Sequence, residues 1–163
     1  MKRAAIITAS DSGYRGERED LSGPAIREIL EREGYEVISM DILPDDQVML
    51  AGKLQEIADS EKAELILTTG GTGFAKRDRT PEATLAVAER IAPGIAEAMR
   101  MESMKITGRA MLSRAVSVIR GNTLIVNLPG SVKAVEENLG FVIPQLEHGI
   151  RILNGTAKEC GRR

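Results

Sequence analysis

The stretch "LILTTGGTGFAKRDRTPEAT", residues Leu65–Thr84, joins three local signals. Its apolar start is typical of a buried strand. The glycines within Gly70–Gly73 indicate a tight turn, and Thr80-Pro81 indicates a helix start, with Thr80 as N-cap and Pro81 as the first helical residue. Strand, glycine loop and helix in this order predict one unit of an α/β fold.

The same alternation continues on both sides of this unit. Apolar runs rich in β-branched residues predict buried strands at residues 4–9, 35–43 and 65–69. Helices are expected after them: one from Gly23-Pro24 to Gly34, one capped by Asp45 or Asp46, and one from Thr80 to about Met101 that breaks at Pro93-Gly94. Repeated strand–helix alternation predicts a mostly parallel sheet with helices on both faces.

The second half of the chain completes this pattern. Residues 115–130 predict two strands around a tight turn at Gly121-Asn122. A last helix with Ser131 as N-cap carries apolar residues at spacings of three and four, and Pro144 within it predicts a bend or a restart. The length of 163 residues favours one domain, residues 1–163, with a loosely ordered tail from about residue 155.

Composition excludes several classes of partner. Lys and Arg total 22 and Asp and Glu total 24, so no overall charge attracts nucleic acid or an anionic membrane. Aromatic residues make up only 2% of the chain, which leaves no stacking platform for single-stranded bases. No segment has the length of a membrane span, and the apolar run at the amino terminus is too short for a signal peptide, so a soluble, cytoplasmic protein is expected.

Neither sulfur nor imidazole chemistry is indicated. Cys160 is the only cysteine and stands in the tail, so it forms no internal disulfide and no zinc site. His148, the only histidine, lies in the last helical pattern, where a surface or interface residue is the more common interpretation. With no Cys–His pair and no Ser–His–Asp set, covalent catalysis is disfavoured.

Polar segments follow the predicted strands. These segments are rich in Gly, Ser, Thr and Asp: Ser10–Gly13, Pro44–Asp46, Gly70–Asp78 and Pro129–Ser131. In open α/β sheets ligands bind beyond the carboxyl ends of the strands. The four segments are therefore expected to gather at one edge and to form one site.

The glycine loop does not match either standard nucleotide motif. Lys76 is not followed by Ser or Thr, as a P-loop requires, and it occupies the place of the third glycine of a dinucleotide fingerprint. Two interpretations remain: an anion-binding nest of backbone N–H groups before a helix, or a tight structural turn. Three nearby cations favour the first interpretation and a phosphate-bearing ligand: Lys76, Arg77 and Arg79.

Asp78 stands among these cations. A carboxylate beside a phosphate is repulsive unless a cation lies between them, and Mg²⁺ is usually held by one or two carboxylates plus phosphate oxygens. Asp45 offers a second carboxylate, although either Asp45 or Asp46 is expected to serve only as a helix cap. Alone, these residues indicate a nucleotide or phosphorylated metabolite with Mg²⁺, and phosphoryl or nucleotidyl transfer.

Several motifs in order resemble a known family. "SDS", "LPDD", "TTGGTG", "RDRTPEAT", "SRAVSVI" and "NLPGS" are similar to those of the molybdenum-cofactor biosynthesis family, molybdopterin adenylyltransferase type. The resemblance implies a three-layer α/β/α sandwich that assembles as a trimer, alone or paired into a hexamer. It also implies MgATP-dependent transfer of AMP to the terminal phosphate of molybdopterin with release of pyrophosphate, and a molybdenum insertase as downstream partner.

The resemblance also assigns site residues. The family's catalytic and metal-binding carboxylates match Asp45 and Asp78. Its nucleotide and pterin contacts match Ser10, Asp11, Thr69, Gly70, Gly71, Thr72, Gly73, Arg79, Thr80, Pro129, Gly130 and Ser131. Two other functions stay open: a non-catalytic molybdopterin carrier or scaffold, and a nucleotide pyrophosphate hydrolase that uses the same loop.

Overall fold

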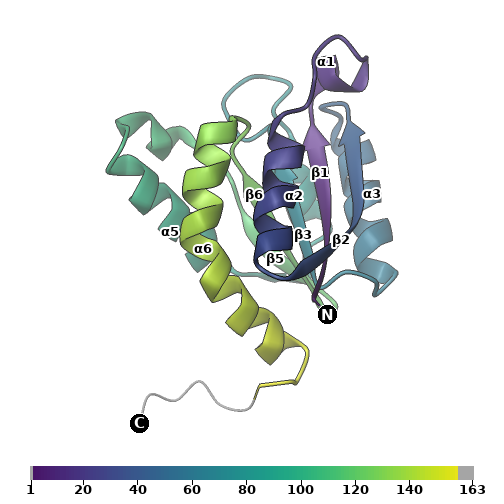
Figure 1. The fold of residues 1–163 in the computed structure, drawn as a ribbon. Helices are drawn as coiled ribbons and strands as arrows, with labels where there is room; N and C mark the ends of the chain where they lie inside the picture. Colours follow the sequence, from purple (N-terminus) through teal and green to yellow (C-terminus); the bar gives the residue numbers. More distant parts are fainter. Residues whose placement is uncertain (1, 158–163) are drawn as a thin grey trace.

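A six-stranded sheet lies between two layers of helices in the computed structural model, which describes residues 2–157 (Figure 1). The strands are β1 Lys2–Ala9, β2 Tyr35–Leu43, β3 Leu65–Thr69, β4 Arg90–Ile91, β5 Ser117–Arg120 and β6 Thr123–Leu128. The helices are α1 Asp11–Tyr14, α2 Ser22–Arg32, α3 Gln47–Asp59, α4 Thr80–Ala86, α5 Pro93–Met104, the 3₁₀ helix η1 Gly108–Leu112, and α6 Val132–Leu153. The predicted three-layer α/β/α sandwich is confirmed.

The sheet is mixed, with a parallel centre. Its order is β2-β1-β3-β6-β5-β4; the first four strands are parallel, whereas β5 pairs antiparallel with both β6 and β4. The antiparallel pair follows from the short turn at Gly121, whose φ of 54° suits glycine. A two-residue connection joins only antiparallel strands, because parallel strands need a long crossover.

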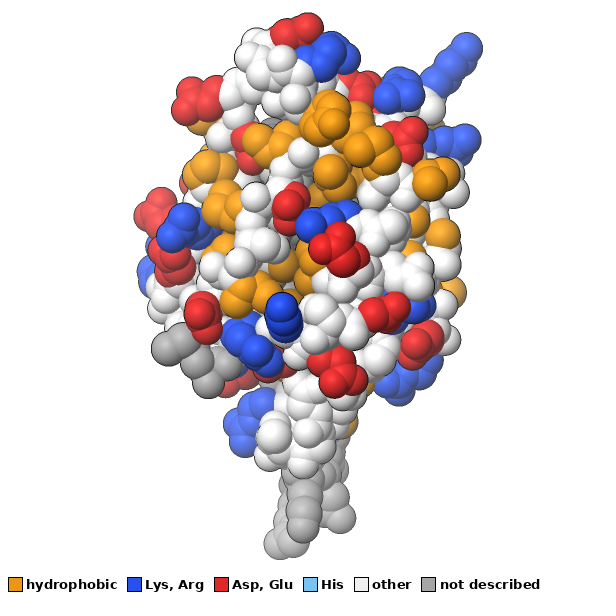
Figure 2. All heavy atoms as spheres, turned by 90° about the vertical axis from the view of Figure 1, so that its right-hand side faces the viewer, with side chains coloured by type: hydrophobic (Ala, Val, Ile, Leu, Met, Phe, Trp, Pro, Cys, Tyr) orange, Lys and Arg blue, Asp and Glu red, His pale blue; other side chains and the backbone are white. Residues whose placement is uncertain are grey.

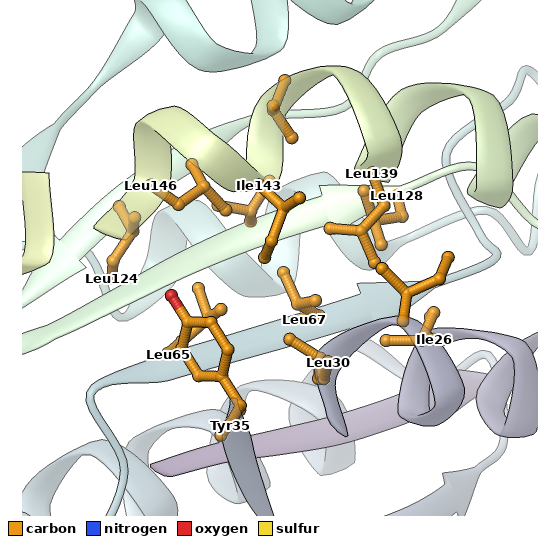
Figure 3. Close-up of a cluster of buried hydrophobic side chains, with 14 of the residues drawn as sticks. Ile26, Leu30, Tyr35, Leu65, Leu67, Leu124, Leu128, Leu139, Ile143 and Leu146 are labelled. Atoms are coloured by element: carbon orange, nitrogen blue, oxygen red, sulfur yellow. The ribbon is translucent and has the colours of Figure 1, made fainter. Parts of the chain in front are cut away.

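Helices cover both faces of the central strands, which explains why these strands are apolar throughout. Residues of β1 alternate between the two faces: Ala4 and Ile6 face α2, α5 and α6, whereas Ala5 and Ile7 face α3 and α4. Figure 3 shows the first of these cores, with Leu65 and other sheet residues packed against α2 and α6. Each fully buried Leu or Ile contributes roughly 1.5–3 kcal/mol of hydrophobic stabilisation.

The region after the glycine loop differs from the prediction. The helix expected to run from Thr80 to Pro93 ends at Ala86, and the short strand β4 follows it. Backbone hydrogen bonds hold β4 against β5, including one from Ala92 N to Ser117 O at 2.9 Å. These partners are distant in sequence, so local propensity did not indicate the strand. The 3₁₀ helix η1 was likewise not predicted.

Two helix starts also need correction. Thr80 is the first residue of α4 and not its N-cap, which is Arg79. The first long helix begins at Ser22, one residue before the predicted Gly23-Pro24. By contrast, Asp46 and Ser131 cap α3 and α6 through their side chains, as the sequence predicts.

Helix α6 continues through Pro144 from Val132 to Leu153, so the predicted restart is wrong. Pro144 cannot donate to the carbonyl of Gly140. Both residues lie on the exposed side of the helix, where water is available to that carbonyl. His148 is also exposed, in the second half of α6.

The carboxyl-terminal end is only partly described. Thr156 N and Ala157 N both donate to Arg151 O, at 2.8 and 3.1 Å. The rest of the tail expected to be loosely ordered, and Cys160 with it, lies outside the described residues. Within residues 2–157, no helix has both the length and the apolar character needed to span a membrane.

Candidate functional site

The polar segments after the strands gather at one edge of the sheet, as predicted. Ser10 N donates to Leu43 O at 2.9 Å, which joins the ends of β1 and β2. Thr69 Oγ1 donates to Pro129 O at 2.7 Å, which joins the ends of β3 and β6. A Cβ on Gly130 would lie 3.3 Å from Gly70 Cα, so the last two loops are in direct contact.

A cleft opens where the strand order reverses. From β1 the chain continues to β2 on one side of it and then crosses to β3 on the other side. Such a reversal is where ligands bind in open α/β sheets. The cleft there has a volume of about 430 Å³. Its lining is more polar than that of the other cavity at this edge and includes Thr8, Ser10, Gly13, Asp20, Ser22, Thr69, Gly70, Gly130 and Ser131.

The glycine loop has a backbone that other residues adopt only with strain. Gly70 and Gly71 have φ of 87° and 68°. A Cβ on Gly70 would lie 2.5 Å from Ala9 O, and one on Gly71 would collide with Thr80 Oγ1. In the described part of the chain, the N–H groups of Gly71, Thr72 and Gly73 donate to no protein acceptor. The loop is therefore both a tight connection and a set of N–H groups suited to an anion.

The adjacent carboxylates of the β2–α3 turn have different tasks. Asp46 Oδ1 accepts from Met49 N at 2.9 Å and caps α3. Asp45 turns towards α1 instead: its Oδ2 accepts from Asp11 N, and Asp11 Oδ1 accepts from Asp45 N, both at 3.0 Å. Asp45 Oδ1 points towards the glycine loop, 3.2 Å from where a Cβ on Gly71 would be.

Asp45 lies in surroundings that disfavour its charge. Burial raises the pKa of Asp45, the hydrogen bond from Asp11 N lowers it, and the negative charges of Asp11 and Asp78 raise it again; the net pKa is above the ordinary value of 3.8. A bound cation would relieve both the burial cost and the repulsion. The donor set at Asp45 and Asp78 therefore fits a divalent cation.

Asp11 is already paired. Arg77 Nε and Nη2 donate to its two carboxylate oxygens at 3.0 and 2.8 Å. Mainly because of this contact, the pKa of Asp11 falls to about 2. The Asp11 side chain thus bonds Arg77 and fixes the Asp45 turn, which links the β1 and β2 ends to the glycine loop.

Asp78 lies on the far part of the glycine loop. Its Oδ2 accepts from Ala75 N at 2.9 Å, and its own N–H donates to Ala75 O at 3.0 Å. A Cβ on Gly73 would approach the same Oδ2 to 2.9 Å, so Gly73 leaves room for this carboxylate. Asp78, Lys76 and Arg79 line a shallow outer depression beside α4.

The charge of Asp78 acts on Asp45, but among the described residues these carboxylates do not belong to a larger group of metal ligands. Across residues 2–157 no group of three or more His, Cys, Asp or Glu side chains comes together to bind a metal. A pair suits Mg²⁺, which keeps several waters and takes its remaining ligands from substrate phosphates.

Thr69 and Thr80 lie beneath the surface of the site. Both are buried; Thr69 bonds Pro129 O, and Thr80 Oγ1 donates to Gly70 O at 2.9 Å. Their hydroxyls therefore hold loops in place.

A second, more apolar cavity of about 320 Å³ begins at the other side of these loops. It is lined by Thr72, Gly73 and Pro129 and by residues of α5, η1 and α6.

Sequence reasoning missed two residues beside these loops. Asp20 lines the polar cleft and accepts hydrogen bonds from Thr8 Oγ1 at 2.8 Å and from Gly23 N at 3.1 Å. Its position just before Ser22-Gly23 is the available signal, since an acidic residue there caps a helix start. Arg114 contacts the glycine loop, and no local pattern in the sequence indicates this contact.

Comparisons with known proteins agree with this geometry. Residues 5–148 match the family described as "Probable molybdopterin binding domain". The molybdopterin adenylyltransferase of Helicobacter pylori strain J99 is 39% identical over 160 residues, which cover 97% of this chain and 91% of that protein. The Escherichia coli K12 protein of the same name is 42% identical over 139 residues, covering 84% and 71%.

Solved structures give the same result. The molybdopterin biosynthesis enzyme MoaB of Thermus thermophilus superposes with a TM-score of 0.90 at 48% identity, covering 95% of this chain and 98% of that chain. A MogA structure superposes with a TM-score of 0.88 at 32% identity, covering 93% and 99%. The chain belongs to the molybdopterin-binding domain family of molybdenum cofactor biosynthesis.

Proposed function

We propose that this protein is a molybdopterin adenylyltransferase, which transfers AMP from ATP to the terminal phosphate of molybdopterin and releases pyrophosphate. The observation that carries the proposal is that the carboxylates of Asp45 and Asp78 lie beside Gly71 and Gly73, whose N–H groups donate to no acceptor in the described residues. Relatives about 40% identical over most of the chain carry this name. A carrier would need neither carboxylate.

Binding of the nucleotide phosphates is assigned to the glycine loop. The N–H groups of Gly71, Thr72 and Gly73 would donate to phosphate oxygens, and Arg79 and Lys76 would add positive charge. The polar cleft and the more apolar cavity meet at this loop, which gives room for the nucleoside and the pterin on its two sides.

Asp45 and Asp78 would hold Mg²⁺. Bound there, Mg²⁺ would neutralise charge on phosphate oxygens that the carboxylates would otherwise repel. Asp11 and Arg77 keep Asp45 turned to the site. Burial raises the pKa of Asp45, so a metal ion that binds there competes with a proton.

The transfer itself needs positioning more than covalent chemistry. An oxygen of the molybdopterin phosphate attacks the α-phosphorus of ATP, a new P–O bond forms, and the bond to the bridging oxygen of the β-phosphate breaks. Pyrophosphate leaves with the bonding electrons. The loop N–H groups would stabilise the charge that develops on the α-phosphoryl oxygens.

We also propose assembly as a trimer, alone or paired into a hexamer. Two groups of apolar side chains on the described surface support assembly: Ile38, Met40 and Ile42 on β2, and Met101, Met104, Ile106 and Met111 around α5 and η1. The β2 residues are 37–38% exposed on an edge strand, and Figure 2 shows hydrophobic side chains gathered on the face that β2 and α3 form. Sedimentation equilibrium of the purified protein measures the subunit number.

A cellular setting follows from the proposed chemistry. ATP as co-substrate places the reaction in the cytoplasm, and the adenylylated pterin requires a molybdenum insertase as the next enzyme.

One assay separates the three functions. Purified protein is incubated with molybdopterin and MgATP, and pyrophosphate, AMP and adenylylated pterin are measured. Pterin-dependent pyrophosphate release with adenylylated pterin supports the proposal. Free AMP without pterin supports a hydrolase, and tight pterin binding without turnover supports a carrier; either outcome contradicts the proposal.

A further inference from the structure

Arg114 lies between η1 and β5 and contacts both ends of the loop that carries Asp78. Its backbone N–H donates to Thr72 O at 2.9 Å. Its side chain continues from there: Nε donates to Gly73 O and Nη2 donates to Asp78 O, both at 2.8 Å. One guanidinium group therefore joins the two ends of residues 73–78.

Glu82 in the first turn of α4 holds the other side of this guanidinium. Its Oε1 accepts from Arg114 Nη1 in an ion pair, and the two side chains are 30% and 33% exposed. The planar guanidinium donates to Gly73, Asp78 and Glu82 at once, which a lysine ammonium on a flexible stem cannot reproduce.

Arg77 attaches the loop to Asp11, whereas Arg114 joins the two ends of residues 73–78 to each other and to the segment before β5. The hydrogen bonds between Asp78 and Ala75 shape the loop, but they do not connect it to the sheet. Arg114 does so, since its segment leads into β5 within three residues. Asp78 is thus tied to the segment before β5 through its own carbonyl oxygen.

We propose that Arg114 is a positioning residue: by joining the carbonyls of Gly73 and Asp78, it holds the Asp78 carboxylate opposite Asp45. Its effect on turnover rests on the proposed adenylyl transfer, whereas its effect on the loop does not. Without the guanidinium the loop ends separate, and a displacement of about 1 Å at a catalytic group costs on the order of 10²-fold in rate.

Arg120 in β5 provides a matched control. Its guanidinium also binds a carboxylate and the backbone, with one carbonyl in place of two: Asp59 at 2.7 and 2.9 Å, and Val87 O at 3.2 Å. None of these partners belongs to the glycine loop or to the carboxylate pair. Arg120→Gln therefore removes similar interactions from the same protein without touching the site.

The test compares wild type, Arg114→Gln, Arg114→Lys, Glu82→Gln and Arg120→Gln. Hydrogen exchange of the Ala75 and Asp78 amides, the backbone N–H groups of residues 73–79 that donate hydrogen bonds, is measured first, without ligand, together with thermal unfolding. We expect exchange in this loop to rise at least tenfold in Arg114→Gln, less in Arg114→Lys and Glu82→Gln, and not at all in Arg120→Gln.

Turnover is then measured as pterin-dependent pyrophosphate release. In Arg114→Gln we expect kcat to fall about 10²-fold, with a smaller change in the KM for ATP, while Arg120→Gln keeps wild-type kcat. Arg114→Lys should recover part of kcat, since one of the two carbonyls regains a donor. If Arg114→Gln does not fold, the Arg114→Lys and Glu82→Gln pair carries the same comparison.

Unchanged loop exchange in Arg114→Gln, or equal losses in Arg114→Gln and Arg120→Gln, would overturn the assignment. A wild-type protein without pterin-dependent turnover would contradict the proposed function instead. In that case the exchange measurement still decides whether Arg114 holds the loop.

Discussion

The β2–α3 turn and the glycine loop each present one carboxylate to the site, but they hold it differently. In the turn, Asp45 is fixed by reciprocal hydrogen bonds with Asp11, in which each carboxylate accepts from the other residue's backbone N–H. In the loop, Asp78 is bonded to Ala75 nearby, and a distant arginine ties the loop down. The contact with Asp11 fixes the position of the Asp45 carboxylate directly, whereas the long loop that carries Asp78 requires support from Arg114.

The largest expected effect comes from removing either carboxylate. Asp78→Asn and Asp45→Asn should each reduce pterin-dependent pyrophosphate release by about 10³-fold, in the range found for loss of one electrostatic group at a transition state. Circular dichroism and thermal unfolding should show an intact fold. Turnover near the wild-type rate in either variant would remove that residue from the site.

The next largest effect tests the glycine loop between the two carboxylates. Gly71→Ala adds a Cβ at φ of 68°, where it meets Thr80 Oγ1 and crowds Asp45. We expect a loss of about 1–3 kcal/mol in unfolding free energy and about 10²-fold in kcat. Gly52→Ala in α3, where a Cβ meets nothing within 4 Å, is the control and should not lose stability. A fully stable and active Gly71→Ala would contradict the need for this backbone.

The neighbouring aspartates Asp45 and Asp46 have different roles in the turn. Asp46→Ala removes the cap of α3, so urea unfolding should show a loss of about 1 kcal/mol while kcat stays close to wild type. Asp45→Ala should do the reverse, with a large loss of kcat and little loss of stability. If Asp46→Ala is the variant that loses turnover, the assignment of Asp46 as cap and Asp45 as site carboxylate is wrong.

The smallest expected effect is a change in proton affinity. The folded-state pKa of Asp45 is above 3.8, so the unfolded protein loses this proton first and the group destabilises the fold as pH rises through that pKa. Asp11 has the opposite sign: its pKa of about 2 contributes stability above pH 3.8, which is lost as pH falls towards 2.

Carboxyl ¹³C chemical shifts followed against pH in the metal-free protein measure both pKa values. Asp78→Asn should lower the pKa of Asp45, because it removes one of the negative charges that raise it. An unchanged Asp45 titration in this variant would indicate that the two carboxylates do not sense each other.

The sequence alone predicted where the turn and the glycine loop lie and which aspartates they carry. The strand-ending segments were predicted to meet because parallel strands share one carboxyl edge, and Asp45, Gly70 and Ser131 lie there as expected. The double aspartate at 45–46 was predicted to divide its tasks, and Asp46 is the cap.

Other contacts depend on partners that no local pattern reveals. β4 exists through pairing with β5, Arg77 is paired with Asp11 across 66 residues of chain, and Arg114 contacts a loop 36 residues before it. Thr80 was predicted to cap α4, but tertiary packing places it inside the helix with its hydroxyl on Gly70 O. Propensity and spacing describe single segments, and these contacts arise only when the segments are assembled.

The role of Asp78 in adenylyl transfer is measured by pterin-dependent pyrophosphate release from wild type and Asp78→Asn, side by side with MgATP and molybdopterin. We predict rapid release and adenylylated pterin from wild type, and about 10³-fold slower release from the equally folded variant. Equal release from both proteins would exclude a catalytic role for Asp78, and no release from wild type would exclude adenylyl transfer by this protein.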